Sequence, residues 1–266
     1  MNKVIIITGG IFAAWNTPMT GYEISAFTVT PVLYWIAFAF GLVTVFLILL
    51  AELLGKPVPK YLTIIKWILL AVCMLSLTML LTLRGVYGLN FNGDTGTHIG
   101  HLKLLLREGT ITSIYPNLYY FTAIFNLLTS IDIVYLTNII PAIFVLIFII
   151  GVFFAAREVF QNTRVAAVSA FVACALPFGT VNNYTGCAPL YDYIPYVQTL
   201  LAFSPLLIYV VYSIVNNRPA KRAYVILGCL LLIAALFYHI LAAAVLLLFT
   251  LCVCIGLYLQ RKLRGK

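Results

Sequence analysis

The chain has 266 residues, of which 64% are hydrophobic and only 9% are charged, and its formal net charge is +9. A soluble globular domain has about 25% charged residues, so this composition excludes a water-exposed surface, and it excludes a disordered chain as well. The Lys and Arg residues lie in short clusters between apolar runs and form no stripe interleaved with aromatics, so no nucleic-acid partner is expected. The sequence therefore predicts an all-α, multi-pass cell-membrane protein with membrane lipid as its immediate partner.

The apolar runs are long enough to suggest several membrane-spanning helices. A helix needs about 20 apolar residues to cross a bilayer. Such runs cover residues 4–20, 25–54, 61–84, 131–156, 164–182, 196–216 and 223–260, and a weaker run covers 116–130. The 223–260 run is too long for one span, so we divide it near Tyr238 and His239. The result is a polytopic transmembrane helical bundle of about eight apolar segments, predicted as a single domain over residues 1–266.

Basic residues indicate an orientation for this bundle. They gather in four segments, at residues 55–60, 156–164, 216–222 and 260–266. Cytoplasmic loops carry an excess of Lys and Arg, so all four segments face the cytoplasm if residues 116–130 do not cross the bilayer. If they do cross, every later loop changes side. A length of about 15 residues is short for a span, which favours a re-entrant or interfacial helix there.

The outer loop at about 85–116 carries the densest group of polar residues. Asn92, Gly93 and Asp94 form a turn sequence, and Asp94 is suited to cap a helix that follows it. Residues 97–108 then show an amphipathic helical pattern, and Gly109 is a plausible stop. Its apolar side is formed by Ile99, Leu102, Leu105 and Leu106. We expect this helix to lie in the membrane interface.

Asp94, His98 and His101 are spaced at i, i+4 and i+7, which places them on one face of a helix that begins at Asp94. A carboxylate with two imidazoles can hold a divalent cation such as Mg²⁺ or Mn²⁺, or it can supply a general base with cationic help for a phosphate. The alternative is structural: Asp94 caps the helix and the histidines are polar residues at a membrane surface. Lys103 and Arg107, one turn apart, can reach lipid phosphates.

These residues also carry a resemblance to a known family. The run from Gly93 to His98, followed by an amphipathic helix that ends at Gly109, resembles the first extracytoplasmic loop of GT-C glycosyltransferases. That superfamily includes protein O-mannosyltransferases, aminoarabinose transferases and oligosaccharyltransferase catalytic subunits. Residues 115–120 resemble the Pro-containing segment after that loop, and residues 155–177 resemble a later helix, basic turn and helix. Residues 20–31 resemble the outer N-terminal segment of archaeal membrane proteins of this kind.

The resemblance implies transfer of a sugar from a polyprenyl-phosphate donor at the extracytoplasmic face. The family's acidic residue in the first outer loop corresponds to Asp94, as base or metal ligand. Arg84, at the outer end of its helix, and His98 or His101 are then suited to meet the donor phosphate. The family's acidic pair is missing because Thr95 follows Asp94, and the chain is shorter than related enzymes. It is therefore expected to be a compact core, the N-terminal module of a longer enzyme, or a non-catalytic relative.

Two other functions remain open on sequence grounds. One is a non-catalytic scaffold or partner subunit with the same fold. The other is a transporter of lipid-linked intermediates, which predicts polar residues within the spans. Glu52 and Lys66 lie near helix ends, where long side chains can extend to the interface. No helix interior is expected to contain a buried carboxylate or Arg, which is unlike most proton-coupled transporters and ion channels. We interpret His239 as an interfacial residue paired with the backbone.

Overall fold

The computed structural model describes residues 31–75, 94–110, 116–179, 195–216 and 219–264. Every regular element in these ranges is an α-helix, which confirms the all-α class. The helices are α3 (Val32–Leu53), α4 (Lys60–Leu75), α6 (Asp94–Glu108), α7 (Pro116–Thr129), α8 (Ile133–Phe160), α9 (Thr163–Gly179), α10 (Pro195–Val215), α11 (Lys221–Tyr238) and α12 (Ile240–Arg264). The expected helix at 4–20 lies outside the described residues.

Four of these helices are long and apolar enough to cross a membrane, namely α3, α8, α11 and the Ile240–Gln260 part of α12. They support the prediction of a membrane protein. The expected number of about eight spans is not supported among the described residues, where α9 and α10 contribute the shorter apolar stretches Thr163–Cys174 and Thr199–Val215. The described part of α4 has 16 residues.

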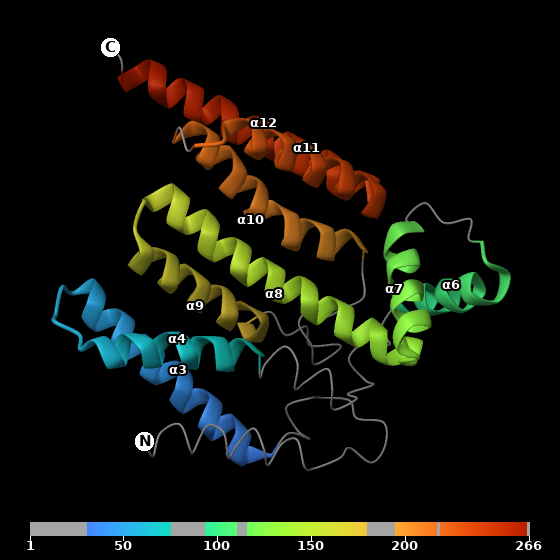
Figure 1. Ribbon diagram of the computed structural model, residues 1–266, viewed down its shortest axis with the longest axis horizontal. Coiled ribbons are helices and arrows are strands. Elements are labelled where there is room, and N and C mark those ends of the chain that lie inside the picture. Colours follow the sequence, from blue (N-terminus) through green and yellow to red (C-terminus); the bar gives the residue numbers. More distant parts are fainter. Residues whose placement is uncertain (1–30, 76–93, 111–115, 180–194, 217–218, 265–266) are drawn as a thin grey trace.

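The bundle is a row of packed helices with α8 near its centre (Figure 1). The α3–α4 pair lies on one side, followed by α9, α8 and α10, with α11 and α12 packed on the far side of α10. Small residues line the inner face of α9, which lets its backbone approach α3 and α8 closely. They are Ala167, Ala170, Ala173 and Cys174.

The contact between α8 and α10 depends on a glycine. A Cβ atom built on Gly151 would lie 2.9 Å from Cγ of Pro205 and 3.3 Å from its Cβ. The proline ring is rigid, so it cannot rotate away as a flexible side chain would. Gly151 therefore sets how closely the two helices approach.

We predict that Gly151→Ala lowers the melting temperature of the purified chain and that Gly151→Leu lowers it further. Overpacking of this kind costs roughly 1–3 kcal/mol. The matched control is Gly256→Ala in α12, where an added Cβ meets no atom within 4 Å. Thermal unfolding in one detergent measures all three variants, and equal melting temperatures for the two alanine variants would contradict the packing role.

The turn between α3 and α4 is closed by a left-handed glycine. Gly55 has φ +70°, a conformation that L side chains rarely adopt. Its N–H donates to the carbonyl of Glu52 at 3.2 Å, and the N–H of Lys56 donates to the carbonyl of Ala51 at 2.9 Å. These two bonds form a Schellman motif, which satisfies carbonyls left without partners at the end of the helix.

The division of the last apolar run is confirmed. α11 ends at Tyr238 and α12 begins at Ile240, with His239 between them in extended backbone. The His239 N–H donates to the carbonyl of Ala235 at 2.8 Å, and its Nδ1 accepts the N–H of Ala242 at 3.3 Å. His239 therefore pairs with the backbone, as its position in the sequence predicted.

The basic turns gather at one end of the bundle, while α6 and α7 lie at the other end, beside the start of α8 (Figure 1). Side chains link adjacent turns: Arg164 bonds to the carbonyl of Glu52, and Asn216 bonds to the carbonyl of Glu158. α7 has 14 residues and is therefore about 21 Å long, short of a hydrocarbon core of about 30 Å. Its length favours the interpretation in which residues 116–130 do not cross the bilayer.

Candidate functional site

The helix expected in the outer loop is present as α6. It begins at Asp94 and ends at Glu108, and Gly109 follows with φ +73° and an N–H donated to the carbonyl of Leu105 at 2.8 Å. The residues of its expected apolar side pack inward, with Leu106 half-buried and the other three buried. The three are Ile99, Leu102 and Leu105.

This apolar side seats α6 against the main bundle. Leu102 and Leu105 share a core cluster with Leu118 of α7 and with Leu136 and Ile140 of α8. α6 is therefore fixed on α7 and on the first turns of α8, and it is not a free surface segment. Any functional side chain on α6 is therefore held at a constant position relative to α8.

The two histidines of α6 lie against one buried tyrosine. A hydrogen bond joins Nδ1 of His98 to the hydroxyl of Tyr119, and the two ring centroids are 5.7 Å apart. The ring of His101 lies 5.8 Å from the same tyrosine ring, which is only 1% exposed. The i, i+3 spacing thus brings both imidazoles to the face of α6 that meets α7.

The structure describes the other predicted site residues only in part. Asp94 is the first residue of α6, and helical register puts its position on the face of His98 and His101, but its side chain lies outside the described ones. Arg84 also lies outside the described residues. Lys103 and Arg107 are exposed on α6.

Metal binding at the outer loop stays a prediction. Among the described side chains, no group of three His, Cys, Asp or Glu is placed to hold a metal ion. The expected ligand set of Asp94, His98 and His101 includes one carboxylate outside those side chains. Arg107, an expected phosphate ligand, lies with its Nη2 2.6 Å from Oε1 of Glu108, in a solvent-exposed pair that leaves its charge accessible.

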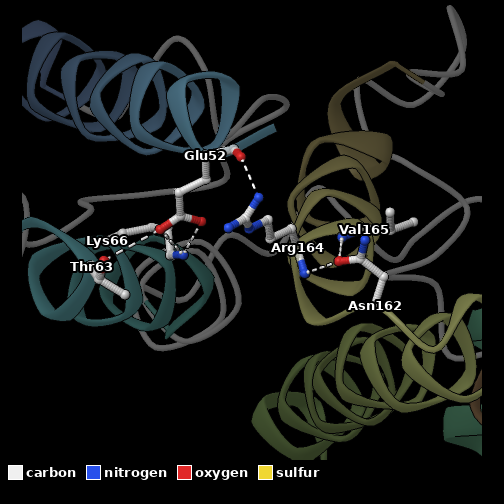
Figure 2. A network of polar contacts seen from close by, with 6 residues as sticks. All are labelled: Glu52, Thr63, Lys66, Asn162, Arg164 and Val165. Atoms are coloured by element: carbon white, nitrogen blue, oxygen red, sulfur yellow. Dashed lines mark hydrogen bonds and ion pairs between the residues drawn. The ribbon is translucent and has the colours of Figure 1, made fainter. Parts of the chain in front are cut away.

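A polar network at the opposite end of the bundle was not predicted from the sequence. The Nζ atom of Lys66 lies 2.7 and 2.8 Å from the two carboxylate oxygens of Glu52, and the hydroxyl of Thr63 donates to one of them at 3.4 Å (Figure 2). The side chains of Lys66 and Glu52 are only 3% and 11% exposed. The expectation that they extend to the interface is therefore wrong: α3 and α4 face each other across a short turn, so each charge meets the other first. The sequence did contain a signal for this pair, because Glu52 and Lys66 have opposite charges and each lies within two helical turns of the short α3–α4 turn.

Arg164 extends this network to a third helix. Its Nη1 donates to the backbone carbonyl of Glu52 at 2.8 Å, reaching from α9 to the end of α3 (Figure 2). Asn162 caps α9, because its Oδ1 accepts the backbone N–H groups of Arg164 at 2.9 Å and Val165 at 3.4 Å. One cationic side chain thus adds a second hydrogen bond to a helix-end carbonyl that already accepts the N–H of Gly55.

A second buried carboxylate lies nearby, at the end of α8. Glu158 is 4% exposed, and its Oε1 accepts bonds from Asn216 at 3.0 Å and from Gln161 at 3.3 Å. The same two amides also bond to its backbone carbonyl, at 2.9 and 2.6 Å. Glu52 and Glu158 are thus buried carboxylates in the last turns of α3 and α8, not in the helix interiors that the expectation concerned.

We predict that Glu52→Gln and Lys66→Met each destabilise the chain by roughly 3–5 kcal/mol, because each leaves a buried charge or donor without its partner. The double variant should lose less than the sum of the two, since no unpaired charge then remains. Denaturant unfolding of the four proteins gives the coupling energy.

The control for this cycle is the exposed pair of Arg107 and Glu108, whose N···O distance of 2.6 Å is equally short. Solvent screening limits such a pair to about 1 kcal/mol or less. A Glu52–Lys66 coupling energy no larger than that of the control pair would show that burial adds nothing to it.

Comparison with known proteins yields no relative. No protein-family model matches the chain, and neither a curated protein nor a solved structure matches it.

Proposed function

We propose that this chain is a multi-pass membrane glycosyltransferase, or a glycosyltransferase-like protein, that uses a polyprenyl-phosphate sugar at the extracytoplasmic face. The observation that carries the proposal is α6 itself. This helix begins at Asp94, holds His98 and His101 on one face against Tyr119, and is seated at the end of the bundle away from the basic turns. The resemblance of residues 93–109 to the first outer loop of GT-C enzymes supports the same function.

The proposed reaction needs a base and a cation-stabilised leaving group. The carboxylate of Asp94 accepts the proton of an acceptor hydroxyl, whose oxygen bonds to the anomeric carbon of the sugar. The bond from that carbon to the phosphate oxygen breaks, and polyprenyl phosphate leaves. Arg84, Lys103 and Arg107 neutralise the phosphate as its charge develops.

In this proposal His98 supplies an imidazole on the same face of α6 as Asp94. Its bond to Tyr119 fixes the orientation of that ring. In an alternative form of the site, Asp94, His98 and His101 hold Mg²⁺ or Mn²⁺, which would polarise the phosphate oxygens instead.

The membrane arrangement follows from the same proposal. The basic turns face the cytoplasm, and α6 and α7 lie at the outer surface. We also propose that α9 and α10 cross the membrane beside α8, since both pack along this 28-residue helix.

We predict that Asp94→Asn lowers turnover of the donor by about 100-fold or more, the usual contribution of a general base. The assay is release of polyprenyl phosphate from polyprenyl-phosphate mannose or glucose by the full chain in vesicles. Glu108→Gln is the matched control, because it removes an exposed carboxylate from the other end of the same helix and should retain turnover. Full turnover by Asp94→Asn would rule out this role.

A chelator separates the two forms of the site. If Asp94 is a metal ligand, EDTA abolishes turnover of the wild-type chain and Mn²⁺ or Mg²⁺ restores it. If Asp94 acts alone as base, EDTA leaves turnover unchanged.

We predict that a green fluorescent protein fused after Lys266 is fluorescent and that alkaline phosphatase fused there is inactive. Both results are expected because the end of α12 lies beside the basic turns, which we place in the cytoplasm (Figure 1). Active phosphatase at this position would reverse the orientation and move α6 to the cytoplasmic face.

One observation favours a second function, that of a non-catalytic scaffold. Both imidazoles pack on a buried tyrosine, which is also what a purely structural pair of histidines would do. A wild-type chain that releases no polyprenyl phosphate from either donor, together with a lower melting temperature for His98→Ala, would favour the scaffold.

A further inference from the structure

A polar hollow of about 420 Å³ opens at the basic end of the bundle, between the α3–α4 turn and the start of α9. Ligand sites in proteins have volumes of about 300–1,000 Å³, so this one can hold a phosphate group with part of an attached head group. It lies at the end opposite to α6, and it is therefore separate from the proposed transfer site.

The hollow has an excess of positive charge. Lys56, Lys66 and Arg164 line it together with one carboxylate, that of Glu52, so three cations less one anion leave a formal +2. The carboxylate is engaged by the ammonium of Lys66 at 2.7 Å. Among the described residues, neither Lys56 nor Arg164 has a carboxylate within ion-pair distance. These two side chains supply the charge available to an anion.

The cations of the hollow are organised by the protein. Arg164 is held by its 2.8 Å bond to the carbonyl of Glu52, which uses one of the five N–H donors of a guanidinium. Arg is well matched to phosphate oxygens because its planar donors can bind two of them at once. Lys56 follows the left-handed Gly55, and its backbone is fixed by the bond to Ala51.

The surroundings of the hollow favour an anion that is attached to a lipid. Leu53, Leu54 and Ile64, on α3 and α4 beside the turn, expose 47%, 64% and 51% of their surface. In a bilayer these apolar side chains would meet acyl chains while the hollow meets the head-group layer. Basic pockets between helices on this side of a membrane are suited to anionic lipid head groups.

We propose that this hollow binds the phosphate of an anionic phospholipid from the leaflet at the basic end, with Lys56 and Arg164 as its ligands. The buried pair of Lys66 and Glu52 also lines the hollow, and because Lys66 neutralises this carboxylate, the charges of Lys56 and Arg164 remain. The lipid would link the α3–α4 hairpin to α9 from outside, in addition to the bond from Arg164.

The test is native mass spectrometry of the full chain after equilibration with equal amounts of phosphatidylglycerol and phosphatidylcholine. The wild-type chain should retain phosphatidylglycerol preferentially. Lys56→Gln with Arg164→Gln should reduce that retention by about tenfold or more, since each basic contact is worth a several-fold change. Arg164→Lys keeps the positive charge at this position, so this variant should keep most of the phosphatidylglycerol retention of the wild-type chain.

The matched control is Lys60→Gln with Arg222→Gln, which removes the same charge from exposed positions near the same end but outside the hollow. Equal losses in the two double variants, or no loss in either, would overturn the site. Lys56→Gln alone tests the site without a risk of misfolding, because that side chain is exposed. This variant should still reduce retention several-fold.

A second arm distinguishes the source of the phosphate. Inorganic phosphate at the concentration of the lipid should not displace phosphatidylglycerol, because it has no acyl chains to meet α3 and α4. Displacement by inorganic phosphate at equal concentration would overturn the lipid assignment.

Discussion

Glu52, through its buried carboxylate and its backbone carbonyl, holds three helices in one arrangement at the basic end of the bundle. Its side chain meets Lys66 of α4, and its backbone carbonyl accepts a bond from Arg164 of α9. Where water is scarce, each polar group left without a partner costs several kcal/mol. Sliding α3 past either neighbour would break one of these contacts, so their register is fixed here. The same contacts hold the start of α9 beside the α3–α4 turn, and the hollow is lined by residues of both segments.

The central helix α8 connects this end to the other. At the basic end it carries Glu158, bonded to the amides that follow α8 and α10. In its middle Gly151 admits Pro205, and at its start Leu136 joins the cluster that seats α6. The 28 residues of α8 span about 42 Å. The two proposed sites, one for a lipid-linked sugar and one for a phospholipid, thus lie at opposite ends of the bundle, connected by a single helix.

Much of the fold could be predicted from local pattern. Composition gave the membrane environment, and the apolar side of α6, its end at Gly109 and the break at His239 all followed from periodicity and helix-end chemistry. The spacing of His98 and His101 placed them on one face, but nothing in that spacing indicated Tyr119, which is more distant in sequence and on another helix. In the part of the chain that the structure describes, four helices are long and apolar enough to span a membrane, fewer than the eight apolar segments counted in the sequence.

The sequence by itself therefore determined the properties that depend on neighbours along the chain: an apolar surface, helices, their caps and their amphipathic faces. Tertiary structure alone decided which charges are buried. Glu52 and Lys66 looked like residues that extend to the interface, since each lies near a helix end and has a long side chain. They became a buried ion pair because the turn between them brings α3 and α4 face to face, and Arg164 joined them across more than a hundred residues of chain. Contacts of that range depend on the packing of the whole bundle.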